Sequence, residues 1–557
     1  MAAGSNFTAS VPARGGLPPL VAAMSRAAFY PQRPARVELI QTHISYVFLT
    51  DEYVYKVKKA VRFPFIDCAT LERRRWLCHE EVRLNRRLAP TVYLGVLAIV
   101  QTAGGFALGD SSAADAVEYV VQMRRLPQER MLDRMVERHE ALPRDLRAIA
   151  QRIADFHRQA ATDKGWLYGS AAAVHKMVHG NLTEAGQLAG KLFDPAELDA
   201  IDEYNRGFIE THWDLLNRRA REGRVCEGHG DLRCEHICMD SQPTVFDCVE
   251  FSERLRYADV ASELAFLAMD LERLAVPSLS HALTEAYIAA AGDRELATLL
   301  PFYQCYRAMV RAKVDGLKSL AREVPEPERI RARDSAHDYL ALARRYLTPV
   351  APAMLMVCGL SGSGKSTLAR ALSRRLGFDL ISSDVIRKQL AGIPPTSRAT
   401  ADYGGGIYSE AFTRRTYITM LAEAEERIRK RRGVILDATF RHADERRLAL
   451  EAVARAGVRA LFVECRAPVA VALERIAQRE RRAGEISDAN AAIYARQIKD
   501  FEPLDELPPE ARLTVDSSAP PDQAVAAVMR ALASPPAPAA PNRTPRRSNL
   551  RQLLNRF

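Results

Sequence analysis

The sequence contains no long apolar run. Apolar residues make up 48% of its 557 residues, but the longest apolar stretches fall well short of the roughly 18 residues that span a bilayer. The N-terminal segment also lacks the apolar core of a signal peptide, because Pro12, Arg14, Pro18 and Pro19 interrupt it. We therefore expect a soluble protein of the cytoplasm with no membrane segment.

Cysteine is sparse, and no C-x-x-C pair occurs. The nine cysteines are an odd number scattered over a long chain, unlike the dense, even set of a secreted disulfide scaffold, so we expect reduced thiols. One stretch, residues 226–248, is rich in Cys and His, but its spacings fit no standard zinc finger. A structural zinc site there is the minor alternative. Its residues would be Cys226, His229, Cys234, His236, Cys238 and Cys248.

Acidic residues are missing from the C-terminal end, where part of the net charge of +10 resides. A positive net charge can indicate nucleic-acid binding. Here the basic tail follows the Pro/Ala-rich segment 534–541, which is typical of an extended linker. A solvated tail therefore explains the charge better than a nucleic-acid partner does. The arginines concerned are Arg543, Arg546, Arg547, Arg551 and Arg556.

The chain of 557 residues is too long to fold around one hydrophobic core, since domains average about 150 residues. Residues 344–352 end a helical pattern with Pro349 and Pro352, which indicates a linker. The expected units are residues 1–348, residues 349–533 and a tail of residues 534–557.

A phosphate-binding loop opens the second unit. Residues 359–366 read GLSGSGKS and fill the pattern G-x-x-x-x-G-K-[ST], directly after the apolar run 354–358 and before a helical pattern. Backbone N–H groups would surround the β-phosphate, Lys365 would reach the β/γ-oxygens, and the Ser366 hydroxyl could ligate Mg²⁺. The predicted nucleotide-binding residues are Gly359, Ser361, Gly362, Ser363, Gly364, Lys365, Ser366 and Thr367.

The first unit begins with strands and continues with helices. Residues 37–40, 45–49 and 53–58 have the pattern of consecutive antiparallel strands, and residues 70–88 that of an amphipathic helix. From about 129 to 220 and 259 to 345 the pattern is almost entirely helical. We expect a small β-rich lobe and a large helical lobe.

Two acidic loops lie in this unit. The segment 229–236 reads HGDLRCEH, and the segment 245–250 reads VFDCVE. Together they resemble the catalytic and metal loops of the aminoglycoside phosphotransferase family, relatives of the protein kinases. The resemblance implies that Asp231 accepts a hydroxyl proton and that Asp247, on the returning strand of a hairpin, holds Mg²⁺ against the ATP phosphates.

The resemblance extends upstream and covers roughly residues 20–345. It implies that Lys56, or Lys58 two residues on, pairs with the phosphates, and that Glu81 anchors this lysine, with Glu80 as the alternative. The segment 119–127 resembles the hinge that contacts adenine. Within this hinge we expect Met123 to line the nucleotide site.

One residue departs from the family's pattern. His236 stands where the kinase catalytic loop carries an asparagine as a second Mg²⁺ ligand, and imidazole is a poorer partner for a hard cation than a carbonyl oxygen. Either one metal ligand suffices, or the lobe binds nucleotide with weak or no transfer. A Gly-rich loop is also missing, so residues 41–45 would cover the phosphates.

A second acidic site follows the phosphate-binding loop. Asp384 ends a probable strand, and Arg387 stands one helical turn on. The arrangement resembles small-molecule P-loop kinases such as gluconate kinase, adenylylsulfate kinase and the zeta toxins. The resemblance implies that Asp384 orients or deprotonates the acceptor hydroxyl and that Arg387 grips the substrate. The alternative is a surface salt bridge.

Strand 434–437 ends in Asp437, which could hold the Mg²⁺ shell or the acceptor. Farther on, Arg475, Arg479 and Arg482 share one helix face. Nucleotide-kinase-like folds carry such arginines on a lid that closes over the phosphates. A plain charged helix face is the alternative.

The tandem order resembles bacterial bifunctional aminoglycoside phosphotransferase/ATP-binding proteins, sometimes labelled AAA-family ATPases. We therefore expect a protein-kinase-like α+β domain, then an α/β P-loop domain with a parallel sheet. The expected activity is ATP- and Mg²⁺-dependent phosphorylation of a small-molecule hydroxyl whose identity the sequence leaves open. Two competing hypotheses are a nucleotide-dependent regulator with a pseudokinase lobe that gates a P-loop ATPase, and a nucleic-acid-associated P-loop enzyme.

Overall fold

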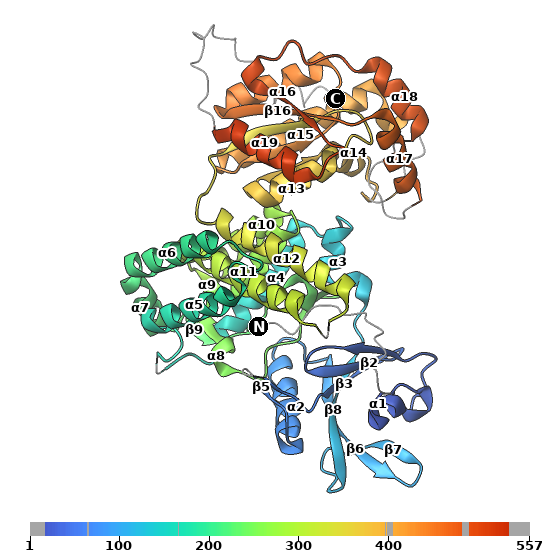
Figure 1. Cartoon of the computed structure of the whole chain (residues 1–557), viewed down its shortest axis with the longest axis vertical. Coiled ribbons are helices and arrows are strands. Elements are labelled where there is room, and N and C mark those ends of the chain that lie inside the picture. The colour runs from blue at the N-terminus through green and yellow to red at the C-terminus, as the bar shows by residue number, and fades with distance from the viewer. Residues whose placement is uncertain are drawn as a thin grey trace. The chain divides into compact units, whose positions relative to one another are not determined.

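The computed structural model describes residues 17–63, 66–164, 166–322, 324–395, 397, 405–481 and 490–533. It divides into two compact units (Figure 1). The first comprises Met1–Val350 with Ser373–Leu380 and Pro394–Thr396, and the second the remainder. The predicted tail, residues 534–557, lies outside the described residues.

The first unit begins with a six-stranded sheet in the order β1-β2-β3-β8-β6-β7, in which every pairing is antiparallel. Along β3, Tyr55 and Val57 enter an apolar cluster on one face of the sheet. Lys56 and Lys58, on the other face, contact Glu81 of α2. Helix α2 packs on β8 and β6. Its N-terminus is capped by Thr70, whose hydroxyl accepts from the Arg73 N–H. The elements are α1 (Pro19–Met24), β1 (Glu38–Gln41), β2 (Ser45–Leu49), β3 (Tyr53–Lys58), β4 (Arg62–Phe63), β5 (Ile66–Asp67), α2 (Leu71–Asn85), β6 (Tyr93–Thr102), β7 (Gly105–Gly109) and β8 (Ala116–Arg124).

The rest of this unit is a helical lobe around one apolar core. Helix α9 is buried along almost its whole length. Helices α10 and α11 pack on α9, α4 packs on α10, and α12 packs on α11. Short strand pairs carry the loops of the site. The elements are α3 (Leu132–Glu137), α4 (Pro143–Gln159), α5 (Ala171–Ala185), α6 (Pro195–Thr211), α7 (Trp213–Arg221), β9 (Val225–Glu227), β10 (Ile237–Met239), β11 (Pro243–Val245), α8 (Glu253–Arg256), β12 (Tyr257–Asp259), α9 (Val260–Arg273), α10 (Pro277–Ala291), α11 (Leu296–Leu320) and α12 (Glu326–Arg345).

The second unit is built on a five-stranded sheet in the order β14-β15-β13-β16-β17. The pairings of β13 with β15 and β16, and of β16 with β17, are parallel. Strands β14 and β15 lie on one side of β13, and β16 and β17 lie on the other, so the strand order changes direction beside β13. In open α/β sheets, ligands bind at such a point, beyond the carboxyl ends of the strands. The elements are β13 (Ala353–Cys358), α13 (Lys365–Leu376), β14 (Asp379–Ser382), α14 (Ser383–Leu390), α15 (Glu410–Arg429), β15 (Val434–Asp437), α16 (Ala443–Ala456), β16 (Arg459–Arg466), α17 (Val469–Glu480), α18 (Ala491–Asp500), β17 (Arg512–Asp516) and α19 (Pro521–Ala533).

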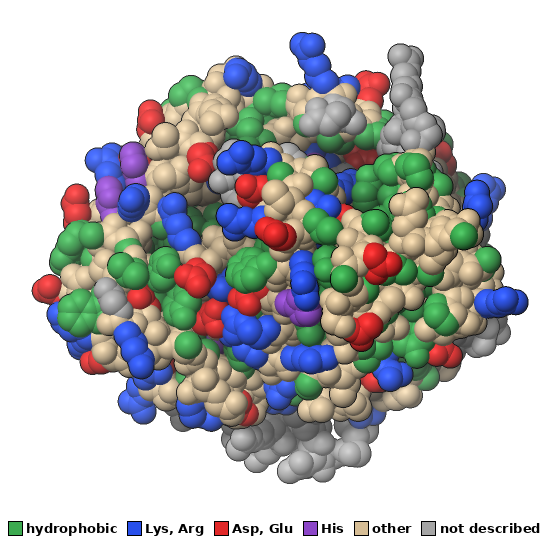
Figure 2. All heavy atoms as spheres, turned by 90° about the horizontal axis from the view of Figure 1, so that it is seen from below, with side chains coloured by type: hydrophobic (Ala, Val, Ile, Leu, Met, Phe, Trp, Pro, Cys, Tyr) green, Lys and Arg blue, Asp and Glu red, His purple; other side chains and the backbone are tan. Residues whose placement is uncertain are grey.

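The fold class predicted from the sequence is confirmed. An antiparallel sheet and a helical lobe form the first unit, and a parallel sheet with helices forms the second. Figure 2 shows one face of the molecule, on which basic side chains are interspersed with acidic and hydrophobic ones.

Candidate functional site

Both lysines of strand β3 reach the same carboxylate. The Nζ of Lys56 lies 2.9 Å from Glu81 Oε1, and the Nζ of Lys58 lies 2.7 Å from Glu81 Oε2. Residues two apart on a strand share one face, so the antiparallel sheet presents both amines to helix α2. Glu80 points elsewhere and pairs with Arg83 at 2.6 Å. The structure therefore places Glu81, and not Glu80, at the site.

Asp247 distinguishes the two lysines. Its Oδ1 lies 2.7 Å from Lys56 Nζ, whereas Lys58 Nζ lies 2.5 Å from Glu250 Oε1. Lys58 and Glu81 are fully buried, while the Lys56 side chain is 13% exposed. Lys56 is thus the lysine that meets the predicted metal ligand, and Lys58 completes a buried ion pair beneath it.

The Asp247 carboxylate is ionised at neutral pH. Burial alone would raise its pKa, but the adjacent Lys56 and His236 outweigh burial and lower the pKa to about 2. Its backbone has a positive φ of 63°, and its N–H donates to the Tyr93 hydroxyl at 3.1 Å. A negative oxygen held in a fixed conformation suits a divalent cation.

Asp231 lies in the loop that follows strand β9. Its side chain is 3% exposed, and its Oδ1 has no hydrogen-bond partner among the described residues. The Nδ1 atom of His236 lies 2.8 Å from the Asp231 carbonyl oxygen and 3.6 Å from its Oδ2. An unpartnered buried carboxylate oxygen is available to accept a proton from a substrate hydroxyl.

Glu263 of helix α9 anchors the backbone of the loop that carries Asp231. The His229 N–H lies 2.8 Å from both carboxylate oxygens. Burial would raise the pKa of Glu263, but the hydrogen bonds and charges of His157 and His229 together outweigh burial and lower the pKa to about 2. At Gly228 an added Cβ would lie 1.8 Å from Glu263 Oε2, so only glycine fits.

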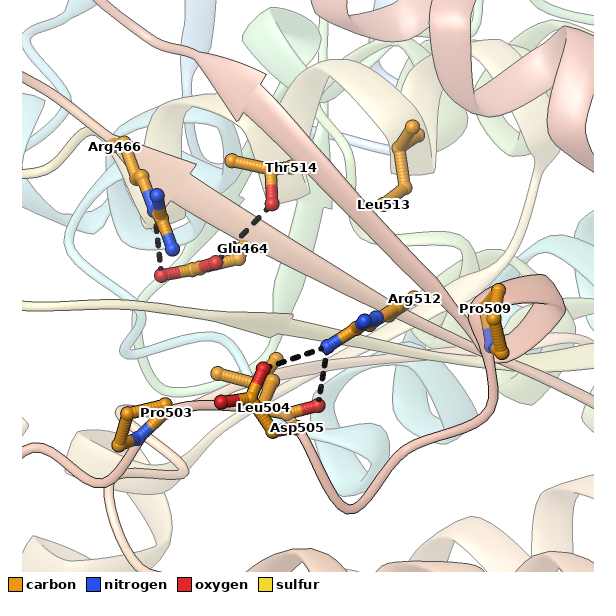
Figure 3. A pocket seen from close by; sticks show the side chains of 9 residues that line it. All are labelled: Glu464, Arg466, Pro503, Leu504, Asp505, Pro509, Arg512, Leu513 and Thr514. Carbon is orange, nitrogen blue, oxygen red and sulfur yellow. Dashed lines mark hydrogen bonds and ion pairs between the residues drawn. The ribbon is translucent and has the colours of Figure 1, made fainter.

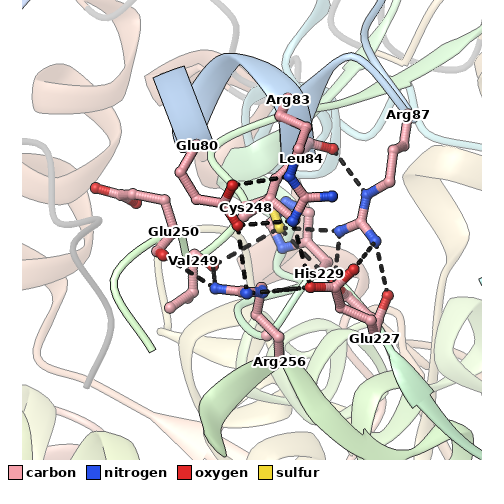
Figure 4. A network of polar contacts seen from close by, with 12 residues as sticks. Glu80, Arg83, Leu84, Arg87, Glu227, His229, Cys248, Val249, Glu250 and Arg256 are labelled. Atoms are coloured by element: carbon pink, nitrogen blue, oxygen red, sulfur yellow. Dashed lines mark hydrogen bonds and ion pairs between the residues drawn. The ribbon is translucent and has the colours of Figure 1, made fainter. Parts of the chain in front are cut away.

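A polar network joins helix α2 to the same loops (Figure 4). The Arg87 guanidinium donates to the carbonyl oxygens of Glu227 and Gly228 at 2.9 and 3.1 Å. Arg256 donates to the carbonyl oxygens of Val249 and Glu250 at 3.2 and 2.9 Å. The network fixes the backbone on both sides of the loop that carries Asp231.

Several of these supporting residues were not predicted from the sequence. Asn85, whose Oδ1 accepts from the Cys248 N–H at 2.9 Å, stands one helical turn after Glu81 and shares its face. This spacing could have identified it. Glu263 and Arg256 carry no such local signal, because their contacts join segments that are separate in the sequence.

Met123 lies in strand β8, opposite Val54 and Tyr93. It is 9% exposed and belongs to an apolar cluster with both of them and Phe246. The segment 41–45 forms the end of a hairpin in which the Thr42 hydroxyl accepts from the Ser45 N–H at 2.9 Å.

The phosphate-binding loop of the second unit follows β13 and ends where α13 begins at Lys365. Gly359, Gly362 and Gly364 have φ values of 128°, 77° and 85°, which favour glycine. An added Cβ at Gly362 would also lie 2.5 Å from the Ala472 carbonyl oxygen. The Lys365 ammonium donates to the Leu360 carbonyl oxygen at 2.8 Å, and burial lowers its pKa.

The acidic groups predicted beside this loop are electrostatically coupled to it. Burial raises the pKa of Asp384, Arg387 and Lys365 oppose that shift, and Asp437 reinforces it. The Arg387 guanidinium donates to Thr413 Oγ1 at 3.1 Å and lies over the Tyr408 ring. The structure therefore brings Asp384, Asp437 and Lys365 into one electrostatic cluster.

Helix α17 carries two of the three predicted lid arginines, and Arg482 lies outside the described residues. Arg475 donates to the Ser517 carbonyl oxygen at 2.7 Å, and an added Cβ at Gly364 would lie 3.3 Å from its Nη1. Arg475 Nη1 and Arg479 Nη2 are buried with no hydrogen-bond partner among the described residues. Both arginines therefore have N–H groups available for an anion.

Gln497 of helix α18 was not predicted. Its Oε1 accepts from the Ser361 N–H of the phosphate-binding loop at 2.9 Å.

A cavity of about 350 Å³ lies against strands β16 and β17 (Figure 3). Its charged groups are paired: Arg466 with Glu464 at 2.8 Å and Arg512 with Asp505 at 3.1 Å. None of the predicted site residues lines it.

All nine cysteines are buried and unpaired. Among the described residues, no group of three or more His, Cys, Asp and Glu side chains is arranged to hold a metal ion. Within the same residues, no helix has the length and apolar character that crossing a bilayer requires.

Comparison with known proteins matches this arrangement. Residues 52–299 match the phosphotransferase enzyme family, and residues 354–504 match an AAA domain. Uncharacterized proteins of Mycobacterium tuberculosis and Mycobacterium bovis are 33% identical over 461 residues, which is 82% of this chain and 89% of theirs.

Among solved structures, a choline/ethanolamine kinase family protein of Mesorhizobium loti is 14% identical, with a TM-score of 0.38, over 59% of this chain and 96% of that one. The APS kinase of Mycobacterium tuberculosis is 23% identical, with a TM-score of 0.25, over 33% of this chain and 100% of that one.

The chain therefore combines a kinase-like phosphotransferase domain with a P-loop kinase-like domain, the arrangement predicted from the sequence. It belongs to the same family as the mycobacterial proteins.

Proposed function

We propose that the protein is an ATP-dependent phosphotransferase that acts on hydroxyl groups of small molecules. The observation that carries the proposal is the contact of the Lys56 ammonium with both Glu81 and Asp247. This contact brings three distant segments of the chain together around one cation. Such a cluster serves to position and neutralise phosphate groups.

In the first unit, the oxygen of the substrate hydroxyl would attack the γ-phosphorus of ATP while Asp231 accepts the hydroxyl proton. The bond between the γ-phosphorus and the leaving ADP oxygen would break in the same step. Lys56 would hold the phosphates, and Asp247 and His236 would hold a divalent cation. When bound, that cation neutralises the charge on the phosphates.

In the second unit, the phosphate-binding loop and Lys365 would hold ATP, and Ser366 and Asp437 would hold Mg²⁺. Asp384 would receive the acceptor proton, and Arg387 would orient the acceptor. Arg475 and Arg479 would offer their buried N–H groups to the phosphates.

A mass-spectrometric screen tests the proposal. The full chain is incubated with ATP, a divalent cation and a metabolite mixture, and products that gain one phosphate are sought. The Asp231→Asn and Lys365→Ala variants assign each product to one unit. ATP hydrolysis without any phosphorylated metabolite, or a product formed equally by the double variant, would overturn the proposal.

A further inference from the structure

The proton on the His236 ring is placed by its surroundings. Its Nδ1 atom lies 2.8 Å from the Asp231 carbonyl oxygen. A carbonyl oxygen only accepts hydrogen bonds, so Nδ1 must be the donor. In the neutral ring the other nitrogen, Nε2, then carries a lone pair, which is how metal-binding histidines are commonly oriented.

That lone pair faces carboxylates. Nε2 lies 3.7 Å from Asp247 Oδ2 and 3.9 Å from Glu235 Oε1. These separations exceed the hydrogen-bond range of about 2.7–3.2 Å, so Nε2 makes no hydrogen bond to either carboxylate. Two ligands that bind one ion at about 2.0–2.2 Å each lie no more than about 4.3 Å apart, so the pair fits a shared cation.

The contact of the other Asp247 carboxylate oxygen agrees with this arrangement. Its Oδ1 is taken by Lys56 at 2.7 Å, which leaves Oδ2 toward His236. Because the described residues contain no three-ligand group of His, Cys, Asp and Glu, an ion held by His236 and Asp247 would complete its shell with nucleotide oxygens and water. The donor set therefore fits a cation that arrives with ATP.

We propose that the pair of His236 Nε2 and Asp247 Oδ2, which the proposed function assigns to the nucleotide-bound cation of the first unit, selects a divalent transition ion such as Mn²⁺ over Mg²⁺. The physical reason is that imidazole binds first-row transition ions well, whereas Mg²⁺ prefers an all-oxygen shell. The inference rests on the proposed nucleotide binding by this unit.

Binding measurements test the preference. In the full chain, Lys365→Ala removes the P-loop site from the signal, and calorimetry compares a non-hydrolysable ATP analogue with Mn²⁺ and with Mg²⁺. Tighter binding with Mn²⁺ is expected. His236→Asn should weaken binding with Mn²⁺ by about 10- to 100-fold, the usual range for disturbed metal sites, and should bring the two ions closer together. His179→Asn, at a side chain that is 57% exposed, is the matched control.

Pulsed electron paramagnetic resonance gives a direct signature of the ligand. Mn²⁺ bound with the analogue should show nitrogen modulation from a coordinated imidazole in the Lys365→Ala protein and in its His179→Asn derivative. His236→Asn and His236→Gln should both lose it. If neither His236 variant folds, the presence or absence of nitrogen modulation in the Lys365→Ala protein decides the ligand assignment.

The outcomes separate the two proposals. Equal binding with both ions and no nitrogen modulation would overturn the ligand assignment and leave the phosphotransferase proposal standing. No binding of the analogue with either ion would instead overturn nucleotide binding by the first unit.

Discussion

At the residue scale, two aspartates near the proposed reaction centres have pKa values shifted in opposite directions. Asp247 has a pKa lowered to about 2 because Lys56 and His236 outweigh its burial. Burial raises the pKa of Asp384, with Arg387 as the main opposing charge. The first suits a permanent cation ligand and the second a group that exchanges a proton.

The pH dependence of transfer by the second unit should follow Asp384. Protonation removes the base, so the rate should fall as the pH drops through a pKa above the ordinary aspartate value. Arg387→Gln removes the charge that opposes the shift, so the acid limb should move to higher pH. The measurement is log kcat/KM for the acceptor against pH, which reports pKa values of the free enzyme. A limb at the ordinary aspartate value, or one that Arg387→Gln leaves in place, would contradict this.

Substituting Asp384 by Asn should spare ATP affinity within a few-fold and lower acceptor phosphorylation by about 10²- to 10⁴-fold, because only the base is lost. ATP affinity is read by calorimetry and transfer by product formation. Loss of nucleotide binding instead would place Asp384 among the cation ligands.

Asp231 and Asp247 should behave differently when each is replaced by Ala in the Lys365→Ala background. Asp247→Ala should weaken metal-dependent ATP binding, because a cation ligand and the partner of Lys56 are lost. Asp231→Ala should leave binding unchanged and affect only transfer. Calorimetry with and without the divalent cation separates them, and identical behaviour of the two variants would argue against the assigned roles.

At the scale of elements, α7 is tied to the loops around it by a buried arginine. Arg219 contacts Asp259 and Asp293, each at 2.8 Å, and all three side chains are nearly fully buried. The neighbouring Arg218 is 47% exposed and pairs with an exposed glutamate. Two adjacent arginines on one helix thus differ mainly in burial.

Arg219→Met should lower the free energy of unfolding of the first unit by about 3–5 kcal/mol, because two buried carboxylates lose their partner. The control Arg218→Met should cost at most about 1 kcal/mol. Urea unfolding followed by tryptophan fluorescence reports the first unit specifically, since Trp76, Trp166 and Trp213 all lie there. Equal effects of the two substitutions would show that the buried triad contributes little.

For the whole molecule, two separate nucleotide sites follow from the proposed function, one in each unit. Equilibrium dialysis with a non-hydrolysable ATP analogue should give about two equivalents bound per chain. Lys365→Ala removes the main fixed cation of one site and should leave about one, as should Asp247→Ala; the double variant should bind none. The exposed Lys430→Ala serves as control. A single equivalent in the parent chain would contradict the two-site reading.

Contiguous patterns were sufficient to predict much of this molecule. The phosphate-binding loop is recognisable because its glycines, Lys365 and Ser366 are neighbours in the chain and their spacing is set by the backbone. The resemblance carried by the segments 229–236 and 245–250 predicted the kinase-like fold. Alternation and helical periodicity located most strands and helices.

Only the tertiary structure decided how these groups meet. The sequence left Glu80 and Glu81 open, and the rotation of α2 against the sheet turned Glu81 toward both lysines. The anchoring by Glu263, the Gln497 contact and the proton position on His236 all depend on atoms brought together from distant segments or by loop conformation. Such contacts arise from packing, which no local spacing in a single sequence encodes.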